Sequence, residues 1–147
     1  MAKTVENFLS DKDKEAILEA IKTAEKNTSG EIRVHIESRC KGSELDRAAA
    51  VFKILGMHKT KLRNGVLIYL AFKDRKFAVI GDAGINKVVP ENYWQDVIDL
   101  MSNYFIRRKF GKGIAAAILM IGEKLKEYFP YQDDDVNELP DDISFGR

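Results

Sequence analysis

The longest hydrophobic run of the chain predicts a strand at the centre of a sheet. Every residue in 66–72 is apolar, and a polar turn, 73–76, separates this run from a second one, 77–80. A strand that is apolar on both faces is covered on both sides, whereas a half-buried strand alternates. We therefore expect an antiparallel hairpin whose first strand lies in the middle of a sheet with helices on both sides.

The residues before the hairpin predict a helix, a strand and a second helix. Ser10 resembles a capping-box residue and precedes apolar positions at helical spacing, and this helix stops before Gly30. Residues 31–37 alternate between polar and apolar, which indicates a half-buried strand near a sheet edge. Ser43 is placed to cap the second helix, and Gly56 ends it.

The residues after the hairpin predict two more helices and a polar tail. The segment 90–105 begins with proline and carries an apolar stripe at helical spacing. A basic loop that contains glycine, 107–113, separates it from a last helix, 114–129. The segment 131–147 is acidic, and we expect it to be irregular.

This order of elements predicts one α/β domain. A strand, a helix and a strand make a right-handed parallel crossover, and the hairpin adds an antiparallel strand. We expect a single domain over residues 1–130, with a small mixed β-sheet at its centre and helices on both faces. An acidic C-terminal tail, 131–147, follows it.

Composition and charge limit the classes of function. The net charge of +1 argues against bulk binding to nucleic acid or to a membrane surface. The only cysteine, Cys40, permits no internal disulfide, which suits a reducing compartment. No segment has the roughly 20 apolar residues of a membrane helix, and the first residues lack the apolar core of a signal peptide. We expect a soluble cytoplasmic chain without a nucleic-acid partner or membrane insertion.

Four short motifs, in this order along the chain, resemble the TPM domain family. They are Thr-Ser-Gly-Glu-Ile-Arg-Val at 28–34, Arg-Asn-Gly at 63–65, Gly-Asp-Ala-Gly-Ile at 81–85 and Phe-Gly-Lys-Gly at 110–113. The resemblance spans about residues 8–130. It implies a compact α/β fold with a central sheet between helices, acid phosphatase activity, and binding of divalent cations, notably calcium.

The chain differs from many members of that family in two respects. Many members carry a signal peptide and a C-terminal membrane anchor, and we expect neither here, as in a small bacterial-type member. At 81–85 the family often has Gly-x-Gly followed by a hydrophobic residue, where this chain has Gly-Asp-Ala-Gly-Ile.

The topology predicts that polar residues from separate segments meet at one edge of the sheet. Parallel pairing places Glu31 beside Asn64, and the hairpin returns Asp82 to that edge, near Glu91 at the mouth of the next helix. Three carboxylates and an amide are hard oxygen ligands, the kind that calcium or magnesium prefers. The sequence therefore predicts a divalent metal site at Glu31, Asn64, Asp82 and Glu91, with Arg63 at its rim to bind an anion or substrate.

Simpler structural explanations exist for these residues. Asp82 has the character of a turn former, Glu91 suits a helix dipole, and Glu31 alternates along its strand as a solvated residue would. Open α/β sheets usually bind ligands at the carboxyl ends of parallel strands, which here would present Glu37. We expect His35 to be a surface or packing residue, because the histidines and the cysteine lack the spacing of soft-metal ligands.

Two functions follow from these patterns. The preferred one is a TPM-like module that binds a divalent cation, with phosphatase activity as a further expectation. No Cys-x5-Arg loop and no P-loop is present, so hydrolysis would have to be assisted by the metal. The alternative is a protein–protein adaptor without catalysis, which the acidic tail favours.

Overall fold

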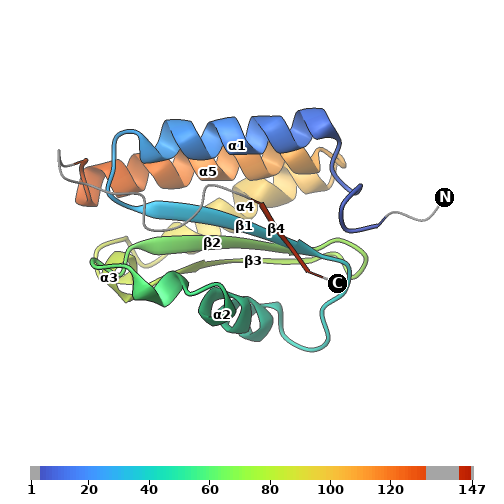
Figure 1. Cartoon of the computed structure of the whole chain (residues 1–147), viewed down its shortest axis with the longest axis horizontal. Helices are drawn as coiled ribbons and strands as arrows, with labels where there is room; N and C mark the ends of the chain where they lie inside the picture. The colour runs from blue at the N-terminus through green and yellow to red at the C-terminus, as the bar shows by residue number, and fades with distance from the viewer. Residues whose placement is uncertain (1–3, 132–142, 147) are drawn as a thin grey trace.

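A four-stranded mixed sheet forms the centre of the molecule (Figure 1). The computed structural model describes residues 4–131 and 143–146. The strands are β1 (Glu31–Glu37), β2 (Gly65–Ala71), β3 (Lys76–Gly81) and β4 (Ile143–Phe145), in the order β3-β2-β1-β4. β2 pairs in parallel with β1 and antiparallel with β3, which confirms the predicted crossover and hairpin.

Helices cover both faces of this sheet, as Figure 1 shows. The helices are α1 (Asp11–Glu25), α2 (Glu44–Ile54), the 3-10 helix η1 (Met57–Lys59), α3 (Ala83–Asn86), α4 (Tyr93–Phe105) and α5 (Phe110–Tyr128). α1, α4 and α5 pack on one face, and α2 with η1 packs on the other. Every residue of β2 is buried, because it lies between two strands and two helical layers. The single α/β domain is therefore confirmed.

Local signals in the sequence set most helix ends. Ser10 and Ser43 each accept a hydrogen bond from the backbone N–H three residues on, which caps α1 and α2 as predicted. Gly56 ends the second helix in the left-handed conformation, with φ of 71°. The short helix α3, which the sequence pattern does not predict, begins after Asp82 as its N-cap.

The last helix begins earlier than its sequence pattern suggests. α5 starts at Phe110, so Gly111 and Gly113 lie inside the helix instead of in a loop. A Cβ at Gly111 would lie 2.5 Å from the Asp13 carboxyl carbon, and one at Gly113 would lie 2.8 Å from the Tyr104 Cβ. These glycines allow close helix packing and are not breakers here. Neither α5 nor any other helix among the described residues is long and apolar enough to cross a membrane.

The predictions for β1 and for the tail need correction. β1 is an interior strand, because β4 pairs in parallel along its outer side, from Val34 opposite Ile143 to Ile36 opposite Phe145. The tail is therefore not irregular at 143–145, while residues 132–142 lie outside the described part. β1 is also more than half buried, since six of its seven residues are buried.

Candidate functional site

The starts of β1 and β2 and the end of β3 bring two carboxylates into one row. Glu31 is the register partner of Gly65, and the Asp82 N–H donates to the carbonyl of Gly65 from the other side at 2.9 Å. Residues opposite one another in a sheet point to the same face, so both carboxylates lie on the face that α2 and η1 cover. Their backbones are two strand spacings apart, about 10 Å.

The residue between these carboxylates has no side chain. A Cβ at Gly65 would lie 3.3 Å from the carbonyl oxygen of Met57, the first residue of η1. The absence of a side chain thus lets a backbone oxygen approach the strand between Glu31 and Asp82. The Met57 carbonyl oxygen therefore approaches the sheet at the strand position between Glu31 and Asp82.

Arg63 holds the carboxylate of Asp82. The Arg63 guanidinium donates twice, from Nε to Oδ2 at 2.7 Å and from Nη2 to Oδ1 at 2.8 Å, and the Ala83 N–H also donates to Oδ1 at 2.7 Å. Burial alone would raise the pKa of Asp82, but these hydrogen bonds outweigh it and hold the pKa below its usual value. The Arg63 side chain is 50% exposed, so its end of the ion pair opens to water. Asp82 is thus a helix cap and an ion-pair partner together.

The other predicted residues are placed differently. Asn64 is 1% exposed, and its Nδ2 has no hydrogen-bond partner among the described residues. The Nδ1 of His58, in η1, and the Oγ1 of Thr60, just after η1, also have no hydrogen-bond partner within the described part. Glu91 is exposed in the turn before α4, so it does not share the buried setting of the other predicted ligands. No three His, Cys, Asp or Glu side chains of the described residues gather as a metal cluster.

The opposite edge of the sheet, where the sequence pattern places Glu37, holds a buried ionic cluster whose other members the pattern does not connect to it. Glu37, which is 3% exposed, accepts from Arg47 Nε at 2.9 Å and Nη2 at 3.0 Å, and also from the Tyr69 hydroxyl. His35 Nε2 lies 3.2 Å from the same carboxylate, and Ser144 Oγ lies 2.9 Å from His35 Nδ1. His35 is therefore a packing residue in this cluster, one of the two roles expected of it.

The C-terminal residues close that cluster. The Gly146 N–H donates to the Ile36 carbonyl at 2.7 Å, and a Cβ at Gly146 would lie 2.6 Å from a carboxylate oxygen of Glu37. Burial alone would raise the pKa of Glu37. Hydrogen bonds from Arg47, Tyr69 and His35 outweigh it and hold the pKa below its usual value. Burial lowers the pKa of His35, which keeps the imidazole neutral at pH 7. The cluster is internally paired and covered, so it stabilises the fold.

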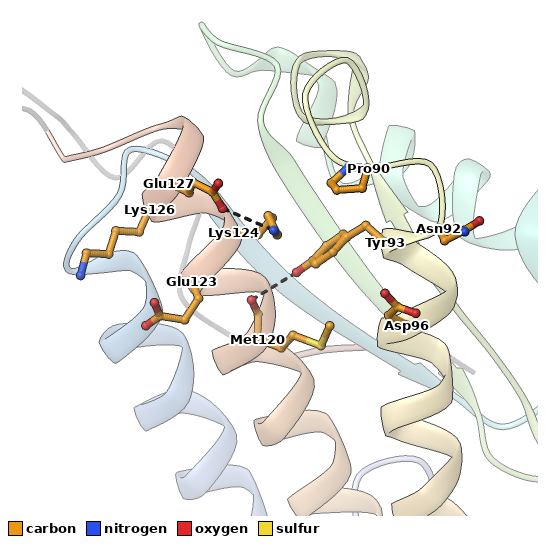
Figure 2. Close-up of a pocket in the computed structure, with 9 residues that line it drawn as sticks. All are labelled: Pro90, Asn92, Tyr93, Asp96, Met120, Glu123, Lys124, Lys126 and Glu127. Atoms are coloured by element: carbon orange, nitrogen blue, oxygen red, sulfur yellow. Dashed lines mark hydrogen bonds and ion pairs between the residues drawn. The ribbon is translucent and has the colours of Figure 1, made fainter.

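A shallow groove of about 690 Å³ lies between the start of α4 and the end of α5 (Figure 2). Two interactions cross or border it: the Tyr93 hydroxyl donates to the Met120 carbonyl at 3.2 Å, and Lys124 pairs with Glu127 at 3.3 Å. The Lys124 ammonium also lies 5.4 Å from the centre of the Tyr93 ring. Acidic and basic side chains both line this groove, so its charge does not favour a ligand of one sign.

Comparisons with known proteins assign the fold and the family. The family model for the TPM domain matches residues 3–124. The NMR structure of the BA42 protein from the psychrophilic bacterium Bizionia argentinensis is 45% identical, with a TM-score of 0.90, over 99% of this chain and 100% of that one. The N-terminal domain of a protein from P. gingivalis has 20% identity and a TM-score of 0.66, over 86% of this chain and 83% of that one.

The N-terminal domain of the cg2496 protein from Corynebacterium glutamicum shares the fold at lower similarity. It is 15% identical, with a TM-score of 0.58, over 80% of this chain and 74% of that one. Comparison with functionally curated proteins gives no match. The motifs at both ends of the hairpin, the sheet order and the family match agree, and the chain belongs to the TPM domain family.

Proposed function

We propose that the chain binds a divalent cation, calcium in preference to magnesium, at the amino-terminal edge of the sheet. The observation that supports this is the row of Glu31, Gly65 and Asp82, with the Met57 carbonyl oxygen against the glycine. Carboxylate and carbonyl oxygens are hard ligands, and calcium accepts irregular sets of six to eight of them. The donor chemistry therefore fits a calcium ion, with Asn64 close by in sequence as an amide ligand.

Arg63 is the residue that a cation would have to displace. Its guanidinium occupies both oxygens of Asp82, yet half of its side chain is exposed, so it can turn toward water. Binding at Asp82 is then a competition between an internal cation and an external one. This makes Arg63 a regulator of affinity at the proposed site, and Glu91 an outer ligand at most, because it is exposed.

A thermal melt of metal-stripped protein with calcium, and separately with magnesium, tests this proposal. Calcium at about 100 times its Kd adds roughly 2.7 kcal/mol to the free energy of unfolding, a rise in Tm of roughly 8 °C for a chain of this size. We expect Asp82→Asn to abolish the calcium-dependent rise and Arg63→Gln to enlarge it, because that change removes the competitor.

Two further variants sharpen that experiment. Glu19→Gln removes a carboxylate from the exposed face of α1 and is expected to keep the full rise. Glu91→Gln shows whether the exposed carboxylate contributes to binding. An equal calcium-dependent rise in Tm in wild type and Asp82→Asn would show that the ion does not bind at this edge. No rise at millimolar calcium would favour the adaptor function instead.

Phosphatase activity is a second function proposed for the same edge, and the open guanidinium of Arg63 favours it. A bound divalent cation supplies polarisation of a phosphoryl oxygen. Arg63, once released from Asp82, presents a planar pair of N–H donors that matches a phosphate. We expect phosphate release from p-nitrophenyl phosphate to depend on calcium or magnesium and to fall at least tenfold in Asp82→Ala. Equal rates in the two proteins would exclude Asp82 from catalysis.

A further inference from the structure

An aromatic groove lies at the other end of the β2–β3 hairpin from the edge discussed above. It has a volume of about 570 Å³ and lies between the β2–β3 turn, the end of α4 and the start of α5. Four phenylalanines and two arginines line it: Phe72, Phe77, Phe105, Phe110, Arg75 and Arg108. None of the residues that line it is acidic.

Ring contacts hold the phenylalanine side chains in place. Phe105 meets Phe77 edge to face with ring centres 4.9 Å apart, and it meets Phe110 at 5.1 Å. Phe72 stacks on Phe8 with ring centres 4.3 Å apart. All four groove phenylalanines are only partly buried. The groove therefore offers a preformed apolar floor that is open to a large side chain.

The side chains of the two arginines at its rim have no polar partner within the described part of the chain. Arg75 and Arg108 are exposed, and neither side chain makes an ion pair or hydrogen bond with a described residue. Both have positive φ, 52° and 58°, a backbone conformation that suits glycine and costs free energy in an arginine. Local stability thus does not explain why arginine stands at these two positions. A role of the two positive charges in binding a ligand would explain it.

We propose that this groove binds an extended acidic segment of a partner protein, one large apolar side chain entering between the phenylalanines while flanking carboxylates meet Arg75 and Arg108. Charge complementarity supports this occupant, because the rim is purely cationic and the guanidinium forks suit carboxylates. A hollow accepts a side chain, whereas a membrane surface would meet a convex apolar patch.

Glycine substitution at the rim gives a test that does not depend on a damaged fold. Arg75→Gly with Arg108→Gly removes both charges and also relieves the positive φ, so the double variant is expected to keep or exceed the wild-type Tm. The matched control, Lys22→Ala with Lys53→Ala, removes two exposed charges from α1 and α2. Both variants therefore change the net charge by the same amount.

The measurement is the fluorescence anisotropy of a fluorescein-labelled peptide, Gly-Asp-Glu-Phe-Glu-Asp-Gly, at low ionic strength. We expect the peptide to bind the wild type and the lysine control with similar affinity. Its Kd for the double glycine variant should be higher by a factor of about ten or more. Replacing the peptide's phenylalanine by alanine, or its acids by serine, should weaken binding similarly.

Three results would overturn the proposal. These are no peptide binding at millimolar concentration, equal affinity in wild type and the double glycine variant, and equal loss in the lysine control. Co-sedimentation with phosphatidylserine vesicles is run on the same proteins. Vesicle binding lost in the glycine variant, without peptide binding, would identify a membrane contact in place of the acidic segment.

Discussion

Glu37→Ala is expected to lower the free energy of unfolding by about 3 kcal/mol, a large part of the stability of a small domain. The change leaves the buried hydroxyl of Tyr69 without its acceptor and takes away the partner of Arg47 and of His35. We place the effect at the low end for a broken buried pair, because Arg47 is 40% exposed and can reach water. Urea unfolding followed by far-ultraviolet circular dichroism measures it.

Acid titration provides an independent check on Glu37. Because its pKa is lowered in the folded state, its contribution is complete above the ordinary value of 4.5 and is lost as the pH falls through the folded-state value. The difference in Tm between wild type and Glu37→Gln should therefore shrink below a pH of about 4.5. The exposed-site change Glu19→Ala should stay within about 0.5 kcal/mol of wild type. A similarly small effect of Glu37→Ala would contradict the role given to the cluster.

Gly84→Ala is expected to lower the free energy of unfolding by about 3 kcal/mol and to disturb the Arg63–Asp82 ion pair. A Cβ at Gly84 would lie 2.1 Å from the Leu62 carbonyl oxygen and 2.6 Å from that of Arg63. These are backbone atoms, so the loop itself must move, and overpacking of this kind costs about 1–3 kcal/mol or more. The Gly84 N–H also donates to the Arg63 carbonyl at 2.8 Å, a bond that the movement would strain.

Gly42→Ala is the matched control for this glycine. Gly42 has φ of 77°, and a Cβ added there would have nothing within 4 Å, so alanine meets a backbone penalty of about 1 kcal/mol without a clash. Urea unfolding should rank Gly84→Ala well below Gly42→Ala in stability. Equal losses in the free energy of unfolding would mean that the loop at 62–63 can move away from α3 at little cost. The contact between them would then not determine the position of Arg63.

The hairpin and the caps could be predicted because their signals are local. An apolar run with a polar turn can be buried on both faces only at the centre of a sheet, and β2 lies there. That Glu31 and Asp82 meet at one end of the sheet follows from the pairing directions, but the register does not: the sequence predicts Glu31 beside Asn64, whereas its partner is Gly65. The contact between Arg63 and Asp82 could not be predicted, since it depends on the φ of 52° at Arg63 and on the entry of the chain into α3.

The sequence misleads where a polar residue is buried by a distant partner. The alternation in β1 indicates a solvent-exposed face. Arg47 and Tyr69 pair with Glu37 on that face, and it is buried. β4 has only three residues, too few for a period, and it forms because the edge of β1 offers unpaired backbone groups. Such effects depend on contacts between elements and leave no local pattern.

The pairing of β4 with β1 also has a consequence for how the chain folds. Val34 meets Ile143 across more than a hundred intervening residues, a loop closure that is costly in entropy and slow to find. During synthesis, the outer edge of β1 stays open until residue 145 has left the ribosome. Nascent chains of this protein therefore pass through an interval in which one strand edge can join a neighbouring chain, and crowding of ribosomes on one message would raise that risk.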